Sequence, residues 1–419
     1  MELAAIILRV YTIFEIILLL VYMARHYMFT YNRAFGEQRL YYQDIVDSEL
    51  DSVTVLVPMH NEGKVARGIM TQLTRVYYPR DRFEVIPIND HSTDNTREII
   101  DEFAAQYPYI TPMHRDKGKR GKPHGLNDAL KIARGDIIVV FDADYLPSHG
   151  IIRDIAICFK DQQVGAVMGR VIPQNTDVNM LTRLLDIERS GGYQVDQQAR
   201  HNLNLIPQYG GTVGGFRKDV AIALGGFNPH ILTEDTELTF MLFLKGWKVV
   251  YANKAECYEE SPESWSVRAR QITRWSRGHT QVMLKSFIPL LKTKHLDVRE
   301  KIDGLFLLLI YMIPLVTIIG IPVSLLIFFM GEMNIVDLVI IFFLVAGYNA
   351  FGNFAPFFQI GTASFLDGAT HRTRLLPLFL FGFLFNMFYI SKGSGSAFLD
   401  ILLKRKPEWQ KTVRFRKHG

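Results

Sequence analysis

Two aspartates at the end of an apolar run are the residues of this 419-residue sequence whose spacing most directly suggests chemistry. Asp142 and Asp144 stand at alternate positions in Val-Val-Phe-Asp-Ala-Asp, directly after a pattern typical of a buried strand. Unpaired charge is costly there, and an oxygen-preferring divalent cation that also binds a phosphate would relieve that cost. The pair therefore predicts a magnesium or manganese site. The alternative is that these carboxylates cap the next helix.

Polar side chains follow two other apolar runs in the same way. His60 and Glu62 come directly after one run, and Asp90 lies at the end of another. In a sheet of parallel strands, ligands bind where the carboxyl ends of the strands meet the loops. We therefore expect these three residues to line the same edge of the sheet as the aspartate pair.

A basic loop with interspersed glycines spans residues 117–125, ahead of a helical pattern. Flexible backbone, clustered cations and a helix N-terminus are suited to binding a diphosphate. The loop is not a nucleoside-triphosphate loop, because no G-x-x-x-x-G-K-[ST] match occurs. The alternative is solvated surface charge.

A third acidic cluster, Thr233-Glu234-Asp235, precedes the amphipathic stretch 238–244. Asp235 would serve as a general base if it were held near an acceptor hydroxyl. The alternative is again that the cluster caps the helix that follows it.

The motif Gln271-Ile272-Thr273-Arg274-Trp275 places three functional side chains on one side of a helix, because Gln271, Arg274 and Trp275 are spaced i, i+3 and i+4. Arginine recognises phosphate groups, and tryptophan offers a flat face on which a sugar can stack. The alternative is a structural helix whose Trp275 packs into the core.

Alternating strand and helix patterns must position these clusters. Residues 52–58, 83–88 and 135–141 have the composition of buried strands, and the amphipathic stretches 64–73 and 126–133 lie between them. Repetition of strand, helix and strand predicts an α/β domain with a mainly parallel sheet and helices on both faces.

Apolar runs at both ends of the sequence predict membrane-spanning helices. Residues 3–24 are almost continuously apolar and read as an uncleaved anchor. Basic residues follow this run directly, which predicts that the central domain is cytoplasmic. Residues 304–330 and 338–360 contain no charged residue, and 375–390 form a third, shorter run.

The number of crossings leaves the side of the basic tail open. One amino-terminal and three carboxyl-terminal spans would place the tail outside, but its seven basic residues and one acid favour the cytoplasm. Either one run is re-entrant or interfacial, or residues 391–403 make a further crossing. The predicted units are an anchor 1–25, a linker 26–50, a catalytic domain 51–262, interfacial helices 263–302, a membrane region 303–403 and a basic tail 404–419.

Composition excludes several classes of protein. The net charge of +5 is confined to the tail, which argues against a nucleic-acid partner. Only Cys158 and Cys257 occur, so a disulfide framework or a cysteine zinc site is not expected. We predict two buried thiols in a reducing compartment, with a single bridge as the alternative.

Taken in chain order, these clusters resemble the motifs of the processive family-two glycosyltransferases, the membrane synthases of cellulose, mixed-linkage glucan, curdlan, hyaluronan and poly-N-acetylglucosamine. The resemblance implies a GT-A fold, which is a Rossmann-like α/β domain, on the cytoplasmic side of the plasma membrane and flanked by transmembrane helices. It implies an inverting transfer from a UDP-sugar to a growing polysaccharide, secreted through the enzyme's own tunnel. The stretches 181–206 and 264–291 would lie at the membrane interface. The motifs concerned are Val57–Glu62, Asn89–Asp94, Asp142–Asp144, Thr233–Asp235 and Gln271–Trp275.

The same resemblance implies a role for each motif residue. Asp235 would deprotonate the acceptor, Asp144 would hold Mg²⁺ or Mn²⁺, and Trp275 would stack on the terminal sugar. Asp90 would contact the uracil and Lys122 the diphosphate. The catalytic set is Thr233, Glu234 and Asp235, the donor-binding set is His60, Glu62, Asp90, Lys122, Asp142, Gln271 and Arg274, and the acceptor-binding set is Trp275, Gly214 and Gly215.

The donor sugar is predicted to be UDP-glucose, polymerised into a β-glucan. One alternative is a synthase that uses UDP-N-acetylglucosamine, alone or with UDP-glucuronate. Another is an enzyme that transfers a single sugar to a lipid phosphate, although that reading gives no reason for the Gln271–Trp275 motif. The lipid bilayer is an expected partner, and the sequence leaves the oligomeric state open.

Overall fold

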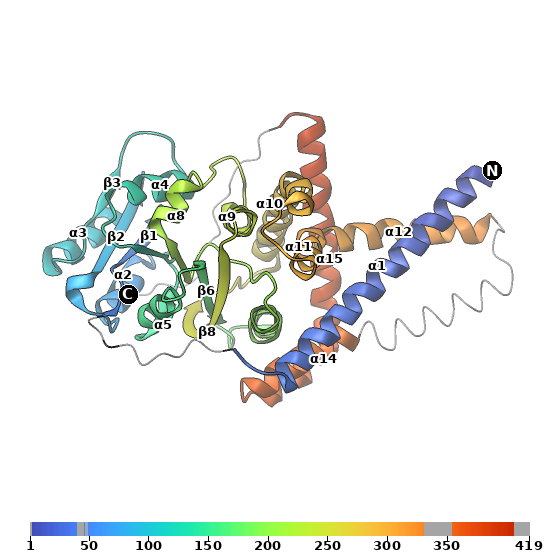
Figure 1. Ribbon diagram of the computed structural model, residues 1–419, viewed down its shortest axis with the longest axis horizontal. Helices are drawn as coiled ribbons and strands as arrows, with labels where there is room; N and C mark the ends of the chain where they lie inside the picture. The colour runs from blue at the N-terminus through green and yellow to red at the C-terminus, as the bar shows by residue number, and fades with distance from the viewer. Residues whose placement is uncertain (1, 40–45, 47–48, 331–353, 406–419) are drawn as a thin grey trace.

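The computed structural model describes residues 2–39, 46, 49–330 and 354–405. Figure 1 shows an α/β domain at one end and long apolar helices at the other. Helices α1 (Glu2–Phe35) and α12 (Met312–Phe329) project away from the domain, and α15 (Leu376–Leu402) runs across their base.

An eight-stranded mixed sheet forms the centre of the domain, in the order β3-β2-β1-β4-β7-β6-β8-β5. The first four strands in this order run parallel to one another, whereas β7 runs antiparallel to both β4 and β6. The strands are β1 (Val53–Met59), β2 (Phe83–Asp90), β3 (Met113–Arg115), β4 (Ile137–Val140), β5 (Leu146–Pro147), β6 (Val164–Pro173), β7 (Gly214–Arg217) and β8 (Lys248–Glu259).

The three predicted strands are confirmed as β1, β2 and β4, and the two predicted helices between them are α2 and α4. Every residue of β2 and β4 is buried, which explains why apolar residues predominate in both strands, although Glu84 interrupts the apolar run in β2. The antiparallel strand β7 was not predicted, because its sequence Gly-Gly-Phe-Arg contains no apolar run.

Helices of the α/β domain pack against the sheet through apolar faces. Ile69, Met70 and Leu73 of α2 are buried in the main core, and so is Ile100 of α3. The domain helices are α2 (Ala66–Thr74), η2 (Arg80–Arg82), α3 (Thr96–Gln106), α4 (Lys122–Ile132), α5 (Ile151–Cys158), α8 (Lys218–Ala223) and α9 (Glu234–Leu244). Cys158 and Cys257 are both buried and free, as predicted.

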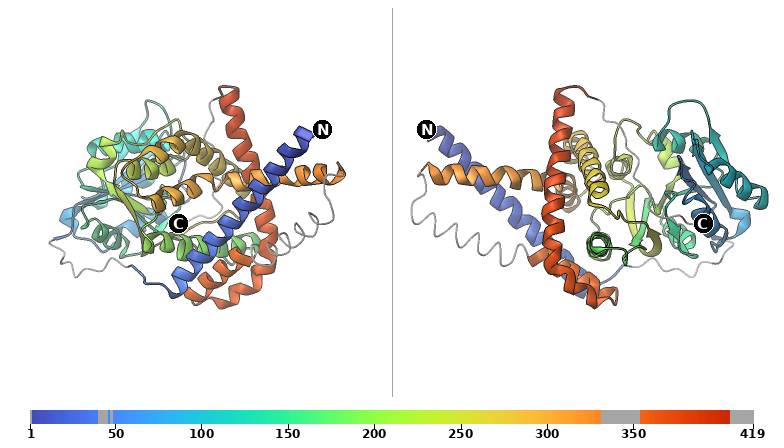
Figure 2. Two further views of the ribbon diagram at one scale, coloured as in Figure 1. Left: turned by 45° about the vertical axis from the view of Figure 1, so that its right-hand side comes forward. Right: turned by 180° about the vertical axis from the view of Figure 1, so that it is seen from behind.

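A layer of helices connects the domain to the apolar helices. Helix α10 packs on α15, and η3 contacts both α1 and α14. Figure 2 shows α10 and α11 between the sheet and α15. The layer consists of α6 (Met180–Ser190), the π-helix η3 (Gly191–Gln197), α7 (Gln198–Asn202), α10 (Trp265–Lys292) and α11 (Val298–Leu309).

Three of the described helices are long and apolar enough to cross a membrane, and they correspond to α1, α12 and the segment Thr370–Leu402. Large apolar side chains on α1, including Ile6, Ile13 and Ile17, are exposed, as expected of a surface that faces lipid. The remaining described elements of this region are α14 (Phe354–Leu366) and η5 (Thr370–Leu375).

The boundaries of the apolar segments differ from those predicted. Helix α1 continues through residues 26–35, which were assigned to a linker, and the run 304–330 is split between α11 and α12. Residues 391–402 continue α15, so the alternative that they form a separate crossing is wrong. Most of the predicted span 338–360 and of the tail 404–419 lies outside the described residues.

A buried ionic network joins α1 to the rest of the protein. Arg25 on α1 lies 3.4 Å from both Asp196 and Asp303. Arg200 on α7 pairs with the same two aspartates, at 2.7 Å from Asp303. Because a buried charge is stable only when it is paired, this network holds the first helix in a defined position against α7 and α11.

Candidate active site

A pocket of about 350 Å³ lies beyond the carboxyl end of β4, between the α/β domain and α10. Its walls therefore come from segments more than a hundred residues apart in the sequence. Nine of the predicted site residues line it: Lys122, Asp142, Asp144, Thr233, Glu234, Asp235, Gln271, Arg274 and Trp275.

Lys122 connects the basic loop to the aspartate pair. It is the first residue of α4, and its Nζ lies 2.7 Å from Asp142 Oδ1 and 3.0 Å from the Gly211 carbonyl oxygen. Burial alone lowers the pKa of Lys122, but Asp142, Glu234 and Asp235 together raise it above its ordinary value. Lys122 therefore carries a positive charge inside the pocket. The alternative interpretation of the basic loop, that its charges are solvated at the surface, does not hold for this residue.

Asp142 and Asp144 do not cap a helix, because they are followed by the short strand β5, and α5 begins only at Ile151. Asp144 is buried and lines the pocket with Asp142. Within the described residues, no group of three or more His, Cys, Asp or Glu side chains is arranged to hold a metal. Two carboxylates are nevertheless a donor set that suits magnesium or manganese whose other ligands come from phosphate and water. The residues therefore fit such an ion.

Glu234 and Asp235 form the first turn of α9 and face Lys122. Burial raises the pKa of Glu234 to about 7, and Lys122 opposes this shift. Burial also raises the pKa of Asp235, against the opposing effects of the Thr236 N–H, Lys122 and Arg274. The Asp235 Oδ1 accepts that N–H at 2.8 Å. The two neighbouring acids share one environment and therefore titrate as a pair.

Gly211 packs directly against Asp235. It has a φ of 73°, and a Cβ at this position would lie 2.9 Å from the Asp235 Cβ and 3.0 Å from its Oδ2. Glycine is therefore needed for both backbone conformation and space. Of this glycine-rich segment, only Gly214 and Gly215 were predicted to be site residues, and Gly211 was not.

Gly214 and Gly215 are not among the residues that line the pocket, so their predicted acceptor contact is not supported by their position. Both lie in β7, where a Cβ on Gly214 would be 2.4 Å from the Val167 carbonyl oxygen. A Cβ on Gly215 would be 2.9 Å from the Ile138 carbonyl oxygen. These glycines allow neighbouring strands to approach, and Gly210 lines the pocket instead.

Helix α10 carries Gln271, Arg274 and Trp275 to the wall of the pocket. Trp275 therefore does not pack into the core, as the alternative of a structural helix expected. The helix can come this close because Gly278 faces the start of α9. A Cβ on Gly278 would lie 2.7 Å from Thr233 Cγ2. One helix therefore brings three predicted residues against the acidic turn.

Asp90 lies at the end of β2 but does not line this pocket. Arg115 and His91 contact one of its carboxylate oxygens, and the other accepts the Gly121 N–H at 2.7 Å. His60 Nδ1 lies 2.7 Å from the Asp90 carbonyl oxygen. In this arrangement Asp90 holds the basic loop in place immediately before Lys122.

Glu62 also lies outside the pocket lining, at the turn that begins α2. Its carbonyl oxygen accepts N–H groups from Val65 and Ala66, and its own N–H donates to Thr96 Oγ1 at 2.9 Å. These contacts connect the end of β1 to α3. A direct donor contact by His60, Glu62 or Asp90 stays a prediction.

The sequence patterns did not identify a second ionic cluster on the pocket wall. Arg189 of α6 pairs with Glu259 at the end of β8, with Nε 2.7 Å from Oε1. Tyr145 Oη donates to the other oxygen of Glu259 at 2.7 Å. Arg189, Glu259 and Tyr145 all line the pocket. These three residues were not predicted, because single residues in distant parts of the sequence form no motif.

Two more pockets adjoin the first and extend between the apolar helices. One, of about 430 Å³, shares Arg189, Tyr193 and Tyr311 with the pocket beyond β4. The other, of about 250 Å³, shares Glu188 and Asn386 with that one. We call these two adjoining pockets the passage.

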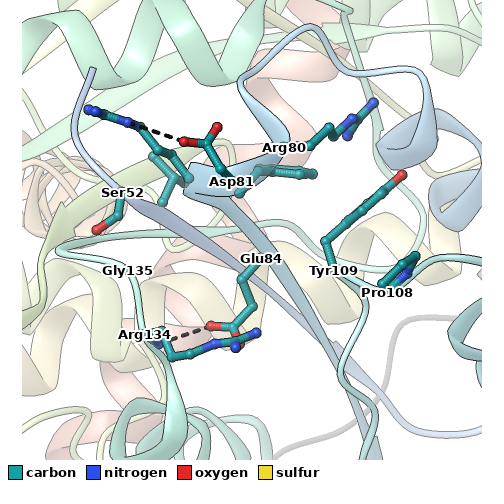
Figure 3. Close-up of a pocket in the computed structure, with 11 residues that line it drawn as sticks. Ser52, Arg80, Asp81, Glu84, Pro108, Tyr109, Arg134 and Gly135 are labelled. Atoms are coloured by element: carbon teal, nitrogen blue, oxygen red, sulfur yellow. Dashed lines mark hydrogen bonds and ion pairs between the residues drawn. The ribbon is translucent and has the colours of Figure 1, made fainter. Parts of the chain in front are cut away.

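A further pocket, of about 400 Å³, lies at the opposite edge of the sheet, where β1 and β2 begin (Figure 3). Its charges are largely paired with one another. Arg134 lies 2.8 Å from Glu84, and Arg82 lies 3.8 Å from Asp81. None of the predicted site residues line it, whereas nine of them line the pocket beyond β4.

A sheet of this topology with paired acids after a central strand, an acidic helix start and a helix-borne Gln-x-x-Arg-Trp motif defines a GT-A glycosyltransferase. The chain belongs to the glycosyltransferase-like family 2, whose family model matches residues 51–278. It is a hexosyltransferase, and both this class and the GT-A fold were predicted from the sequence.

Several known proteins are similar to this chain. A probable glycosyltransferase, YdaM, of Bacillus subtilis (strain 168) is 30% identical over 403 residues, which cover 94% of this chain and 93% of the relative. The β-monoglucosyldiacylglycerol synthase of Nostoc sp. (strain PCC 7120 / SAG 25.82 / UTEX 2576) is 30% identical over 276 residues, or 65% of this chain and 58% of that protein. The poly-β-1,6-N-acetyl-D-glucosamine synthase of Staphylococcus aureus (strain COL) is 27% identical over 252 residues, or 60% of each chain.

Among solved structures, the mannosyltransferase PcManGT from Pyrobaculum calidifontis, in complex with GDP-Man and Mn²⁺, matches with a TM-score of 0.60. The match has 19% identity and covers 95% of this chain and 99% of that one. The likeness shows that the two proteins share a fold.

Proposed function

We propose that the protein transfers a hexosyl group, with inversion, from a UDP-sugar to a hydroxyl of an acceptor that reaches the pocket through the passage. The observation that carries this proposal is the grouping of Asp235, Lys122 and Arg274 around one pocket with the aspartate pair. A base, two cations and a phosphate-facing acidic pair are what a displacement at an anomeric carbon requires.

Asp235 accepts the proton of the acceptor hydroxyl as its oxygen bonds to the anomeric carbon. The bond between that carbon and the diphosphate breaks on the opposite side, so the configuration inverts and UDP leaves with the electron pair. Lys122 and Arg274 neutralise the charge that grows on the diphosphate. Mg²⁺ or Mn²⁺ held by Asp142 and Asp144 would supply further positive charge there.

The passage supports a growing glycan as the acceptor. The residues that line its larger pocket include Gln197, Gln208, Asn386 and Gln359, which offer hydrogen bonds, together with aromatic rings such as Tyr193. Amides and aromatic rings are suited to binding sugars, and the passage leads from the catalytic pocket towards α1 and α15. Polymer extension, with UDP-glucose as the predicted donor, therefore remains our first candidate, and UDP-N-acetylglucosamine is its alternative.

A lipid acceptor is the second candidate. The smaller pocket of the passage is lined by Pro314, Pro356, Phe379, Phe383 and Met387, which would accommodate an acyl chain better than a sugar. Relatives of both kinds occur, since one makes a glucosyldiacylglycerol and another makes a polymer.

Product analysis distinguishes the two candidates. Membranes that contain the full-length protein are incubated with each radiolabelled UDP-sugar, and the product is extracted with organic solvent and digested with linkage-specific hydrolases. A solvent-insoluble polymer supports extension, and a single sugar on an extractable lipid supports the second candidate. No transfer from any UDP-sugar would contradict the proposal.

Activity should be lost as the pH falls through about 7. The base must be deprotonated, and burial holds the pKa of the neighbouring Glu234 near 7. Below that pH the pair gains a proton that either acid can hold, so the fraction of the enzyme in which Asp235 is ionised and can accept the acceptor's proton falls. The measurement is the initial rate of labelled-sugar transfer between pH 5 and 9, with UDP binding as the control. A rate that stays constant down to pH 5 would contradict this prediction.

Substitution of Gly211 by alanine should lower the rate of transfer by about 10- to 100-fold, because the new Cβ displaces the Asp235 carboxylate. Gly225 provides a matched control, since it also has a positive φ, of 91°, but a Cβ there meets no atom within 4 Å. Gly225→Ala carries the same type of backbone strain without the contact. Equal loss of activity in both variants would show that strain alone is responsible.

A further inference from the structure

Trp275 lies beside two guanidinium groups. The Cζ of Arg189 is 5.3 Å from the centre of its ring system, and the Cζ of Arg268 is 5.6 Å away. Both distances are within the range at which a cation is attracted to an aromatic face. Arg268 lies two turns before Trp275 on α10, whereas Arg189 comes from α6, so the ring is held by two different helices.

Each guanidinium is fixed by a carboxylate. Arg189 makes a two-pronged contact with Glu259, with Nε and Nη2 at 2.7 and 3.2 Å from the two oxygens. Arg268 Nη2 donates to Glu188 Oε1 at 2.6 Å, and its Nη1 donates to Gln271 Oε1 at 3.0 Å. Two-pronged arginine–carboxylate pairs constrain orientation as well as distance. The guanidinium of Arg189 therefore has a defined position against the ring.

The Arg189–Glu259 pair also reaches the donor side of the pocket. Glu259 Oε2 accepts a hydrogen bond from Tyr145 Oη at 2.7 Å, and Tyr145 directly follows Asp144 in the chain. A displacement of the segment Asp142–Tyr145, which would hold the proposed metal, would therefore move Glu259 and Arg189 and so change the contact with Trp275.

Arg189 stands where the catalytic pocket meets the passage, because it lines both. An acceptor that comes through the passage must move past Arg189 before it reaches Asp235. The pair is therefore at the position where the orientation of an incoming sugar or polyol would be set.

We infer that Arg189, held by Glu259, is a positioning residue that fixes the ring of Trp275 and so aligns the acceptor hydroxyl with Asp235. The inference rests on the proposed function, since it assumes a hydroxyl-bearing acceptor at Trp275. Loss of the Arg189–Glu259 pair should leave the residues that bind the UDP-sugar in place. The acceptor hydroxyl would then no longer be aligned with Asp235. Water then takes its place more often, and UDP is released without sugar transfer.

The test compares Arg189→Met, Arg189→Lys and the control Arg183→Met in the full-length protein in membranes. Arg183 lies on the same helix and is exposed. Two quantities are measured: the affinity for UDP, and the ratio of labelled sugar transferred to UDP released. We expect Arg189→Met to lower this ratio by about tenfold while the affinity for UDP stays within about twofold. Arg189→Lys should restore part of the ratio, and Arg183→Met should leave it unchanged.

An unchanged ratio in Arg189→Met would overturn the inference, and so would a loss of UDP affinity equal to the loss of transfer, which would indicate a structural role alone. A spectroscopic measurement separates this failure from failure of the proposed function. Arg189→Met should change the tryptophan emission of the wild type but not that of a Trp275→Phe background, whether or not transfer from a UDP-sugar is detected. An emission change of the same size in both backgrounds would show that Arg189 does not act at Trp275.

Discussion

Replacement of Asp235 by asparagine is expected to lower sugar transfer by about a thousandfold or more while UDP still binds with its wild-type affinity. The amide has the shape of the carboxyl group, and its oxygen can still accept the Thr236 N–H that Asp235 Oδ1 accepts at 2.8 Å. The start of α9 should therefore keep its structure. What is lost is the ability to take the proton from the acceptor.

Two variants make the Asp235 result interpretable. Asp81→Asn removes one carboxylate from an 80% exposed side chain at the opposite edge of the sheet and should leave the rate unchanged. Glu234→Gln tests the neighbouring acid of the same pair. A large loss in Glu234→Gln together with a small loss in Asp235→Asn would assign the base to Glu234 instead.

Replacement of Lys122 by methionine is expected to lower the transfer rate by about a hundredfold or more and to weaken UDP binding. Lys122 lies 2.7 Å from Asp142 and lowers the pKa of both Glu234 and Asp235. Without this cation the acids hold their protons to higher pH. The acidic limb of the rate profile should therefore move to higher pH, in addition to the loss of rate at its maximum.

Lys131→Met is the matched control for the Lys122 prediction, because Lys131 lies near the other end of the same helix and is 75% exposed. This variant should match the wild type in rate and in pH profile. A Lys122→Met enzyme with reduced rate but an unmoved acidic limb would show that Lys122 acts on the diphosphate alone and not on the acidic pair.

The central strands of the sheet, the aspartate pair that follows β4 and the Gln271–Trp275 motif could be predicted, because each depends on a local sequence pattern. The strands that became β1, β2 and β4 are almost entirely buried, so apolar residues predominate in each of them and polar residues gather at or just after its end. Because parallel strands share one edge, Asp142 and Asp144 could be placed there without a structure. The helix-borne motif from Gln271 to Trp275 was recognisable for a similar reason, since its spacing fits one helical side.

Features that depend on contacts between distant segments were not predictable. Arg189 and Glu259 are 70 residues apart in the chain, and they meet because α6 packs on β6, which pairs with β8. The predicted acceptor contact of Gly214 and Gly215 is not supported by their position, for a related reason. A glycine-rich segment indicates close approach, but the sequence does not say whether the approaching group is a ligand, a neighbouring strand or, as at Gly211, the side chain of Asp235.

The ionic network around Arg25 has a consequence for how the protein is made. Arg25 and its partner Asp303 are separated by 278 residues. At a synthesis rate of ~5–20 residues per second, the ribosome needs roughly 15 to 55 s to reach Asp303 after Arg25 has been added. Asp196, the other partner of Arg25, is synthesised before Asp303, so Arg25 can pair with Asp196 while the network is still incomplete. Docking of the amino-terminal helix against α11, as distinct from η3, which carries Asp196, can therefore be completed only late in synthesis.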